Sequence, residues 1–242
     1  MIRPSTQIYT DYTAEDFRVW KILFDRQMEI LSETVSRNYL DAIKIVNFRN
    51  DRIPDFNEVN STLDNLTGWK LHVVPNISPQ KDFFKFLSEK KFTATCWLRS
   101  FEQLDYIEEP DMFHDVFAHV PLLSNSSYCD FFKGISDIAM EHIDDPKAIE
   151  LLGRIYWFTI EFGLIREKGS LKIYGAGIIS SNGETKHCLS NESEKVEFDV
   201  KKILATDFRT DILQSKYFVI DSFEELYDAL PRIKELIITN ND

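Results

Sequence analysis

Two histidines five positions apart, His114 and His119, are the residues whose type and spacing first suggest chemistry. Neutral imidazole is the commonest metal ligand in proteins, so a close pair of histidines indicates a candidate metal site. On an ideal α-helix, five positions separate two side chains by roughly 140° and by about 7.5 Å along the axis. Both rings can therefore reach one metal only where the helix is short, distorted or ending. Spacing alone favours the other interpretation, in which one histidine caps a helix and one is hydrogen-bonded in the core, because an H-x4-H pattern arises easily by chance.

Glu161 is the third candidate, because it is an ionisable residue inside the otherwise apolar helical run IYWFTIEFGL. An unpaired buried carboxylate costs several kcal/mol, so this side chain must face water, pair with a cation or bind a metal. Arg154 and Arg166 are the nearby cations that offer a surface ion pair. Two histidines and one carboxylate would match the facial triad of non-haem iron(II) oxygenases, which leaves metal positions open for oxygen and substrates.

The pattern of apolar residues and caps predicts that helices position these three side chains. Thr13 and Asp16 resemble a capping box that opens a helix, and Ser222 with Glu225 resembles another. Asp55 is a candidate cap for a helix that Gly68 would end. Further helices are predicted from Pro79, over 128–140, and in one apolar stripe from Pro146 to Leu164, with a short helix ending at Pro121 around the histidine pair.

Strand-like segments are few and short, at 70–74, 92–98, 172–174, 196–198 and 217–220. Neither an internal repeat nor a linker rich in Pro, Gly or Ser divides the chain. The sequence therefore predicts a mainly α fold with minor β structure, in one domain over residues 1–242.

Composition restricts the partners and the compartment. The formal net charge of −12 and the pI of about 4.9 disfavour binding to nucleic acid or to an anionic membrane surface. The sequence contains neither an apolar run typical of a signal peptide nor one long enough to cross a bilayer. Cys96, Cys129 and Cys188 are widely spaced and odd in number, which favours reduced thiols over a disulfide framework. We expect a cytoplasmic enzyme or binding domain.

Three longer segments add a family resemblance to these observations. EEPDMFHDVFAHVPLL, IYWFTIEFGL and YGAGIISSNGE resemble signature stretches of the pterin-dependent aromatic amino acid hydroxylases, and most closely the short bacterial phenylalanine 4-hydroxylases. The similarity extends from Tyr12 to about Leu226. It implies one catalytic domain with an iron- and pterin-binding core at about 70–190, without a regulatory domain or a tetramerisation tail. A monomer is therefore expected.

The resemblance assigns the two histidines and Glu161 to the family's iron ligands. It also places Arg99 on the arginine that binds the substrate α-carboxylate, and a guanidinium suits this role because it forms a planar two-toothed fork. From the residues alone, the alternative is that Arg99 is an exposed side chain that pairs with Glu102 or Asp105.

Four further residues receive roles only through the resemblance. Phe83 falls on the ring that stacks against the pterin, although its spacing with Phe86 and Leu87 is also that of a core phenylalanine. Asp115 falls on an acidic residue near the pterin. Trp157 and Ser180 fall on residues that border the substrate pocket and the iron site.

The implied function is the hydroxylation of L-phenylalanine to L-tyrosine by a monooxygenase that uses iron(II), a tetrahydropterin and O2 as co-substrate. Two alternatives remain open. One is a tryptophan hydroxylase of the same family, because the shape of the pocket decides the choice of ring. The other is a catalytically silent protein that binds a metal or an amino acid. Three protein ligands favour catalysis, since a structural zinc site normally has four.

Overall fold

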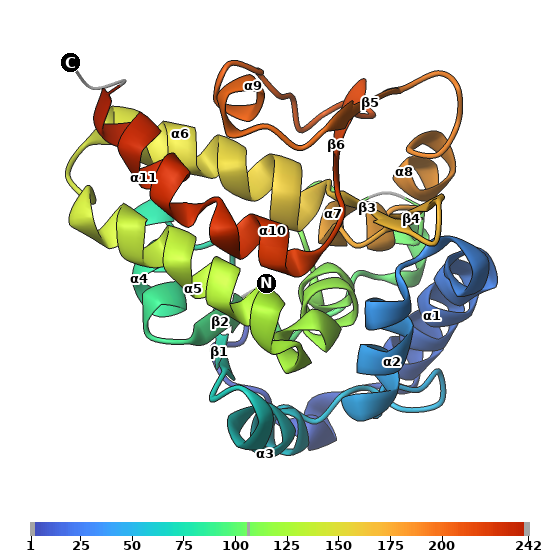
Figure 1. The fold of residues 1–242 in the computed structure, drawn as a ribbon. Helices are drawn as coiled ribbons and strands as arrows, with labels where there is room; N and C mark the ends of the chain where they lie inside the picture. The colour runs from blue at the N-terminus through green and yellow to red at the C-terminus, as the bar shows by residue number, and fades with distance from the viewer. Residues whose placement is uncertain (1–2, 106, 240–242) are drawn as a thin grey trace.

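Helices form most of the structure and the strands are short, as Figure 1 shows for the computed structural model, which describes residues 3–105 and 107–239. The α-helices are α1 (Ala14–Thr34), α2 (Arg37–Ile45), α3 (Phe56–Leu66), α4 (Gln80–Ser88), α5 (Ser126–Glu141), α6 (Pro146–Tyr156), α7 (Ala176–Ile179), α8 (Asn182–His187), α9 (Val200–Leu204), α10 (Phe223–Asp228) and α11 (Leu230–Thr239). Shorter 3-10 helices are η1 (Tyr9–Asp11), η2 (Phe101–Gln103) and η4 (Pro121–Ser124), and two π-helices are η3 (Phe113–His119) and η5 (Trp157–Glu161). The predicted fold class is confirmed.

The predicted helix starts are confirmed where a polar side chain caps the helix. The Thr13 hydroxyl accepts a hydrogen bond from the Asp16 N–H, and the Asp16 carboxylate accepts one from the Thr13 N–H. Ser222 caps α10 by accepting from the Glu225 N–H, but the Glu225 carboxylate accepts from the Asp221 N–H, so the predicted capping box is only half formed. Asp55 caps α3, and Gly68 follows the end of that helix with a φ of 75°, which favours glycine.

Two helix boundaries differ from the prediction. The stripe that begins at Pro146 does not continue to Leu164, because α6 gives way to η5 and Leu164 then begins a strand. Leu164 pairs there with Ile173 and Val219, so distant strand partners outweigh the local helical pattern. Pro121 does not simply end the histidine helix. It occupies the first position of η4, where its missing N–H is not needed.

The strands form two small sheets rather than isolated segments. Strand β1 (Lys70–Val73) pairs in parallel with β2 (Lys91–Ala94). The second sheet has the order β4-β3-β6-β5 and consists of β3 (Leu164–Glu167), β4 (Ser170–Ile173), β5 (Glu194–Glu197) and β6 (Lys216–Ile220). Only the β3–β4 pair is antiparallel, and β3 itself was not predicted.

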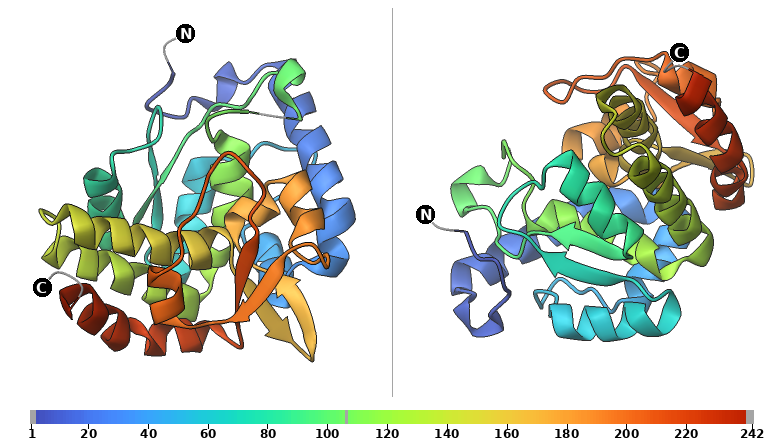
Figure 2. Two further views of the ribbon diagram at one scale, coloured as in Figure 1. Left: turned by 90° about the horizontal axis from the view of Figure 1, so that it is seen from above. Right: turned by 90° about the vertical axis from the view of Figure 1, so that its left-hand side faces the viewer.

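Helices α5, α6 and α11 lie side by side on one flank of the molecule, and α1 with α2 lie on another (Figures 1 and 2). The chain around the histidine pair runs between these groups of helices, where Phe113 and Phe117 stack at 4.5 Å and are fully buried. Trp20 of α1 packs edge-on against both rings, and the Tyr39 hydroxyl of α2 donates to the Phe117 carbonyl at 2.7 Å. Within the described residues, none of the helices is both long and apolar enough to span a membrane.

The close approach of two backbone segments at Gly175 generates a stability prediction. A Cβ atom on Gly175 would lie 2.4 Å from the Glu161 carbonyl oxygen and 2.5 Å from the Gly163 nitrogen. We expect Gly175→Ala to lower the free energy of unfolding by about 2–3 kcal/mol in urea titrations, because backbone atoms must move to admit the methyl group.

Gly153→Ala is the matched control. Its Cβ would lie 3.5 Å from the Gln80 amide nitrogen, an ordinary contact, on helix α6. This change should leave stability unaltered or raise it by up to about 1 kcal/mol. Equal effects of the two substitutions would show that the crowding at Gly175 is not the cause.

Candidate active site

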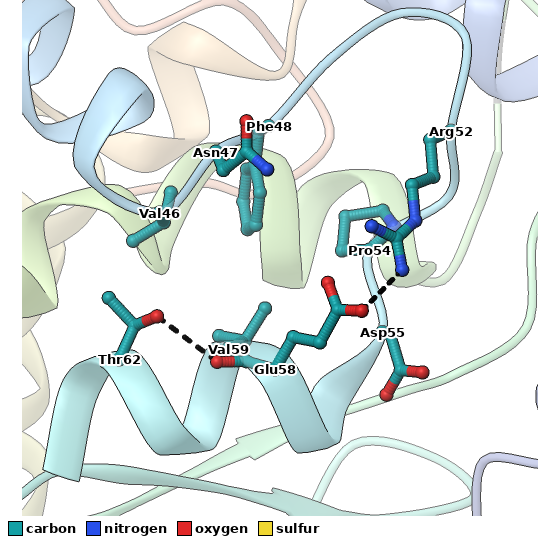
Figure 3. Close-up of a pocket in the computed structure, with 9 residues that line it drawn as sticks. All are labelled: Val46, Asn47, Phe48, Arg52, Pro54, Asp55, Glu58, Val59 and Thr62. Atoms are coloured by element: carbon teal, nitrogen blue, oxygen red, sulfur yellow. Dashed lines mark hydrogen bonds and ion pairs between the residues drawn. The ribbon is translucent and has the colours of Figure 1, made fainter.

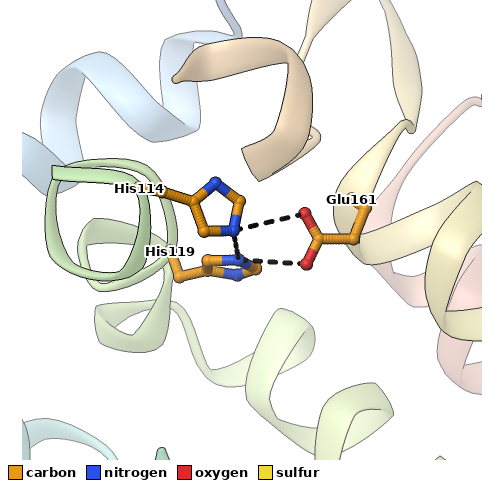
Figure 4. A group of neighbouring side chains, drawn as sticks. All are labelled: His114, His119 and Glu161. Atoms are coloured by element: carbon orange, nitrogen blue, oxygen red, sulfur yellow. Dashed lines mark hydrogen bonds and ion pairs between the residues drawn. The ribbon is translucent and has the colours of Figure 1, made fainter. Parts of the chain in front are cut away.

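The side chains of His114, His119 and Glu161 converge, and they do so from two different π-helices (Figure 4). Their ligand atoms all lie within 4.8 Å of one another. His119 Nε2 is 3.2 Å from Glu161 Oε1, His114 Nε2 is 3.8 Å from Glu161 Oε2, and the two Nε2 atoms are 3.4 Å apart. Within 3–105 and 107–239, this is the group of His, Cys, Asp and Glu residues with the geometry of a metal site.

The π-helical turns explain how histidines five positions apart reach one point. A π-helix closes its hydrogen bonds from residue i to residue i+5, so its turn is wider than that of an α-helix. His114 and His119 stand in η3, and Glu161 ends η5, where the Phe162 N–H donates to the Trp157 carbonyl at 2.9 Å. The helix distortion that the histidine spacing required is thus present in η3, and the segment that carries Glu161 has the same π-helical form.

Ser180 fixes which nitrogen of His114 carries the proton. The Ser180 hydroxyl donates to the Ala176 carbonyl at 3.0 Å, and its oxygen lies 2.8 Å from His114 Nδ1. Because that hydroxyl has only one proton, its oxygen accepts from His114 Nδ1–H. His114 Nε2 then presents a lone pair to the centre of the site, which is the arrangement that a metal ligand needs.

The protonation states also suit a metal. Burial lowers the pKa of His114, which keeps its ring neutral at pH 7. Burial alone would raise the pKa of Glu161, but attraction and a hydrogen bond from His119, with smaller contributions from His114 and Tyr156, lower it to about 2. An ionised Glu161 carboxylate thus faces the neutral His114 ring, and both are suited to donate electron pairs to a cation.

The surface ion pairs considered for Glu161 are not formed. Arg154 pairs with Glu150 and Asp207, and Arg166 pairs with other carboxylates near the second sheet. His119 is only 2% exposed, and its Nε2 is the ring nitrogen that faces Glu161 and His114. A divalent cation satisfies these three converging groups better than any nearby side chain does, so the donor set fits iron(II).

Arg99 lies near the site but does not face open solvent. It is 8% exposed, and its guanidinium forms a fork on Asp111, with Nε at 2.9 Å and Nη2 at 2.8 Å from the two carboxylate oxygens. The Arg99 N–H also donates to Asp111, which is fully buried. The partners considered from the sequence, Glu102 and Asp105, are therefore wrong, and Nη1 is the guanidinium nitrogen that Asp111 leaves free.

Phe83 connects to the site through a second ring. It is half-buried on α4 and meets Tyr156 edge-on at 5.3 Å. Tyr156 in turn stacks on His119, with ring centroids 6.5 Å apart. Its hydroxyl contributes a hydrogen bond that lowers the pKa of Glu161.

Asp115 follows His114 and is held by the chain beyond β2. Its carboxylate accepts from the Thr95 N–H at 2.7 Å and from the Thr95 hydroxyl at 2.8 Å. Burial raises the pKa of Asp115. The residue therefore lies beside the candidate ligands in a fixed orientation.

Comparison with known proteins places this chain in a family. The family of biopterin-dependent aromatic amino acid hydroxylases matches residues 4–239 of this chain. The chain belongs to this family. Phenylalanine-4-hydroxylase of Chromobacterium violaceum is 42% identical over 221 residues, which cover 90% of this chain and 73% of the relative. Tyrosine 3-monooxygenase of Homo sapiens is 33% identical over 224 residues, which cover 91% of this chain and 42% of the relative.

Solved structures of this hydroxylase family agree with the fold. The phenylalanine hydroxylase of C. violaceum with bound oxidised Fe(III) superposes with a TM-score of 0.93 at 40% identity, covering 100% of this chain and 88% of that one. The same protein with iron(III) and 7,8-dihydrobiopterin gives a TM-score of 0.91 at 39% identity, covering 99% and 87%. The family resemblance stated from the sequence is confirmed.

Three residues in this hydroxylase were missed by sequence reasoning about the site. Asp111 holds Arg99 and also accepts from the His114 N–H at 3.3 Å. Tyr156 links Phe83 to the ligands, and Gln214 accepts a hydrogen bond from the Trp157 indole at 3.0 Å. Asp111 and Tyr156 stand inside the quoted motifs and were available as signals, whereas Gln214 lies far along the chain in an unremarkable segment.

A separate surface pocket shares no residue with this site (Figure 3). It lies between α3 and the chain that precedes it, and within it Arg52 pairs with Glu58. Its lining residues are Val46, Asn47, Phe48, Arg52, Pro54, Asp55, Glu58, Val59 and Thr62. Since its opposite charges satisfy each other, we assign it no role.

The Ser180–His114 hydrogen bond generates a prediction about metal affinity. Ser180→Ala removes the acceptor that orients the ring, and we expect iron(II) or Co(II) to bind about tenfold more weakly in calorimetric titrations. Ser124→Ala is the control, because Ser124 donates to a backbone carbonyl in η4 and contacts no ligand. An affinity that Ser180→Ala leaves unchanged would remove Ser180 from the support of the site.

Proposed function

We propose that this chain hydroxylates L-phenylalanine to L-tyrosine with O2, using iron(II) and a tetrahydropterin. The observation that carries the proposal is the convergence of two histidines and a glutamate in a member of this hydroxylase family. Relatives named phenylalanine-4-hydroxylase from several bacteria favour phenylalanine over tryptophan as the substrate. The facial arrangement with three protein ligands favours catalysis over a silent metal site.

His114, His119 and Glu161 would hold the iron, which when bound supplies the redox chemistry that activates O2 together with the reduced pterin. The chain itself positions these ligands. Ser180 holds the His114 tautomer, and the Tyr156 hydroxyl contributes a hydrogen bond to the Glu161 carboxylate. Burial of His119 and Glu161 limits the access of water to the reacting centre.

The half-buried ring of Phe83 would stack against the pterin, and Asp115 would lie close to it. These roles suit their positions, because Phe83 reaches the ligands through one intervening ring and Asp115 adjoins His114. Trp157 would border the amino-acid pocket, since it begins the turn that ends at Glu161.

Arg99 would bind the substrate carboxylate, but through fewer donors than a free guanidinium offers. Its Nε and one side of Nη2 are directed to Asp111, so Nη1 and the second Nη2 proton remain for the substrate. Asp111 orients the guanidinium before the substrate arrives, and this lowers the entropy that binding must overcome.

We also propose that the catalytic unit is a single domain that acts as a monomer in the cytoplasm. The free, buried cysteines Cys96, Cys129 and Cys188 support a reducing compartment. The net charge of −12 disfavours nucleic acid and anionic membranes as partners. Light scattering that gives twice the chain mass of 28.4 kDa would reject the monomer.

The direct test offers phenylalanine, tryptophan and tyrosine separately to the purified chain with iron(II), a tetrahydropterin and O2. We expect tyrosine from phenylalanine as the main product, with oxygen uptake that depends on the pterin. Glu161→Ala should lose most of its iron and its activity while far-UV circular dichroism stays that of the parent chain. Glu150→Ala, an exposed glutamate on α6, should retain both.

Two results would contradict the proposal. Stoichiometric iron without pterin-dependent oxygen uptake on any aromatic amino acid would reject the enzyme. Iron affinity that survives Glu161→Ala would reject the ligand set.

Arg99 generates a separate kinetic prediction. Arg99→Lys keeps the charge but loses the fork, and we expect the KM for phenylalanine to rise at least about tenfold with a smaller change in kcat. Arg99→Ala would also leave Asp111 buried without its partner, at a cost of about 3–5 kcal/mol in stability. Arg26→Lys, in an exposed pair with Asp105, is the control. An unchanged KM in Arg99→Lys would exclude Arg99 from substrate binding.

A further inference from the structure

The loop of residues 205–215, between α9 and β6, contacts the first residue of the turn that carries Glu161. The Phe208 ring stacks on the Trp157 indole, with centroids 4.4 Å apart and planes inclined by 17°. Gln214 Oε1 accepts a hydrogen bond from Trp157 Nε1 at 3.0 Å. The loop therefore holds the indole by its face and by its edge.

Every polar group of Gln214, in the backbone and in the side chain, makes a hydrogen bond. It is 5% exposed, and its N–H donates to Glu184 Oε1 at 2.9 Å. Its carbonyl lies 3.1 Å from His187 Nε2, which donates to it. Its side-chain amide donates to the carbonyls of Arg209 at 2.7 Å and Ile212 at 3.1 Å. With both backbone groups and both ends of the amide engaged, Gln214 has one orientation.

The anchor of this arrangement is a buried carboxylate. Glu184 is 5% exposed on α8, and burial raises its pKa. The hydroxyl of Tyr217 on β6 is hydrogen-bonded to its second oxygen. Burying a carboxyl group is unfavourable unless its hydrogen bonds are made, and here the groups that satisfy it are Tyr217 and the backbone of Gln214. None of Glu184, His187, Gln214 and Tyr217 has a part in the proposed chemistry.

Trp157 is placed where its orientation matters for the metal ligand. Its carbonyl accepts the hydrogen bond from the Phe162 N–H that closes η5, and Glu161 is the residue just before that donor. The Phe162 ring also packs against the indole at 4.6 Å. The indole thus contacts the chain at both ends of a five-residue π-turn. Because such turns are rare and need support from their surroundings, a fixed indole restrains the turn.

We propose that Gln214 is a positioning residue for the metal centre, which sets the direction of the Glu161 carboxylate by fixing Trp157 at the start of η5. The inference rests on the proposed role of Glu161 as a metal ligand. Gln214 does not touch the reacting groups. It acts through one indole N–H, so its effect should disappear when that N–H is absent.

A double-mutant cycle with Co(II) as the probe tests this relation in the full-length chain. Gln214→Leu removes the acceptor, and Trp157→Phe keeps an aromatic ring but removes the N–H. Mutation of a residue that hydrogen-bonds a metal ligand typically weakens metal binding by about 10- to 100-fold. Gln214 contacts Trp157 rather than a ligand, so its effect should be smaller. We expect each single change to weaken Co(II) binding by about three- to tenfold and to alter the visible absorption of the bound ion.

The double variant decides between positioning and general packing. If Gln214 acts through the indole N–H, Gln214→Leu combined with Trp157→Phe should bind Co(II) no more weakly than the weaker single variant. Effects that multiply, or a Gln214→Leu affinity within twofold of the parent chain, would overturn the inference. Should Gln214→Leu fail to fold, Trp157→Phe alone decides, because unchanged Co(II) affinity there also overturns it.

Two controls distinguish a failure of the role of Gln214 from a failure of the role of Glu161 as a metal ligand. Arg209→Ala removes an exposed ion pair with Asp211 in the same loop but leaves the backbone carbonyl that Gln214 uses, so Co(II) affinity should not change. Glu161→Ala should abolish Co(II) binding. If Glu161→Ala still binds Co(II), the proposed ligand set fails. If it does not, while Gln214→Leu binds normally, only the role of Gln214 fails.

Discussion

A carboxylate and two imidazoles are brought together in the interior, and much of the surrounding structure serves to keep them there. Each group would be better solvated in water, and the neutral ring of His114 offers little charge to offset Glu161. Two π-turns, η3 and η5, bring the three side chains to one point. Such turns are rare, and here the stacked rings of Phe113 and Phe117 pack beside η3 while Phe208 stacks on Trp157 at the start of η5.

The groups that contact the candidate ligands are themselves completed by hydrogen bonds from distant parts of the chain. Ser180 reaches His114 from the end of α7, and Thr95 reaches Asp115 from the end of β2. Gly175 lies against the backbone of Glu161, where a side chain would not fit. The second sheet thus contributes to the site through the segment that follows β4, which carries Gly175 and Ser180, rather than through its strands.

Sequence reasoning succeeded where the signal is local. Capping pairs such as Thr13 with Asp16 are fixed by neighbours along the chain, and the confirmed helices follow from apolar spacing. It failed where distant partners decide, as at Leu164, whose strand pairing with Val219 cannot be read from its own segment. The spacing of His114 and His119 indicated a distorted helix but not a π-turn. The donor types alone suggested that Glu161 could join the pair, the motif similarity assigned it there, and nothing local identified Gln214.

Asp111 connects Arg99, the proposed substrate-binding residue, to His114, a candidate metal ligand. One of its carboxylate oxygens accepts from Arg99 Nη2 and from the His114 N–H, and the other accepts from the Arg99 N–H and Nε. The segment that carries Arg99 is also fixed by Tyr12, whose hydroxyl donates to the Cys96 carbonyl at 2.7 Å. In the proposed role of Arg99, a substrate carboxylate bound to its guanidinium would act on a group whose partner, Asp111, also accepts from the His114 N–H at the start of η3. The fully buried Asp111 cannot replace a lost partner with water, so a movement of Arg99 would be transmitted to the backbone of a candidate metal ligand.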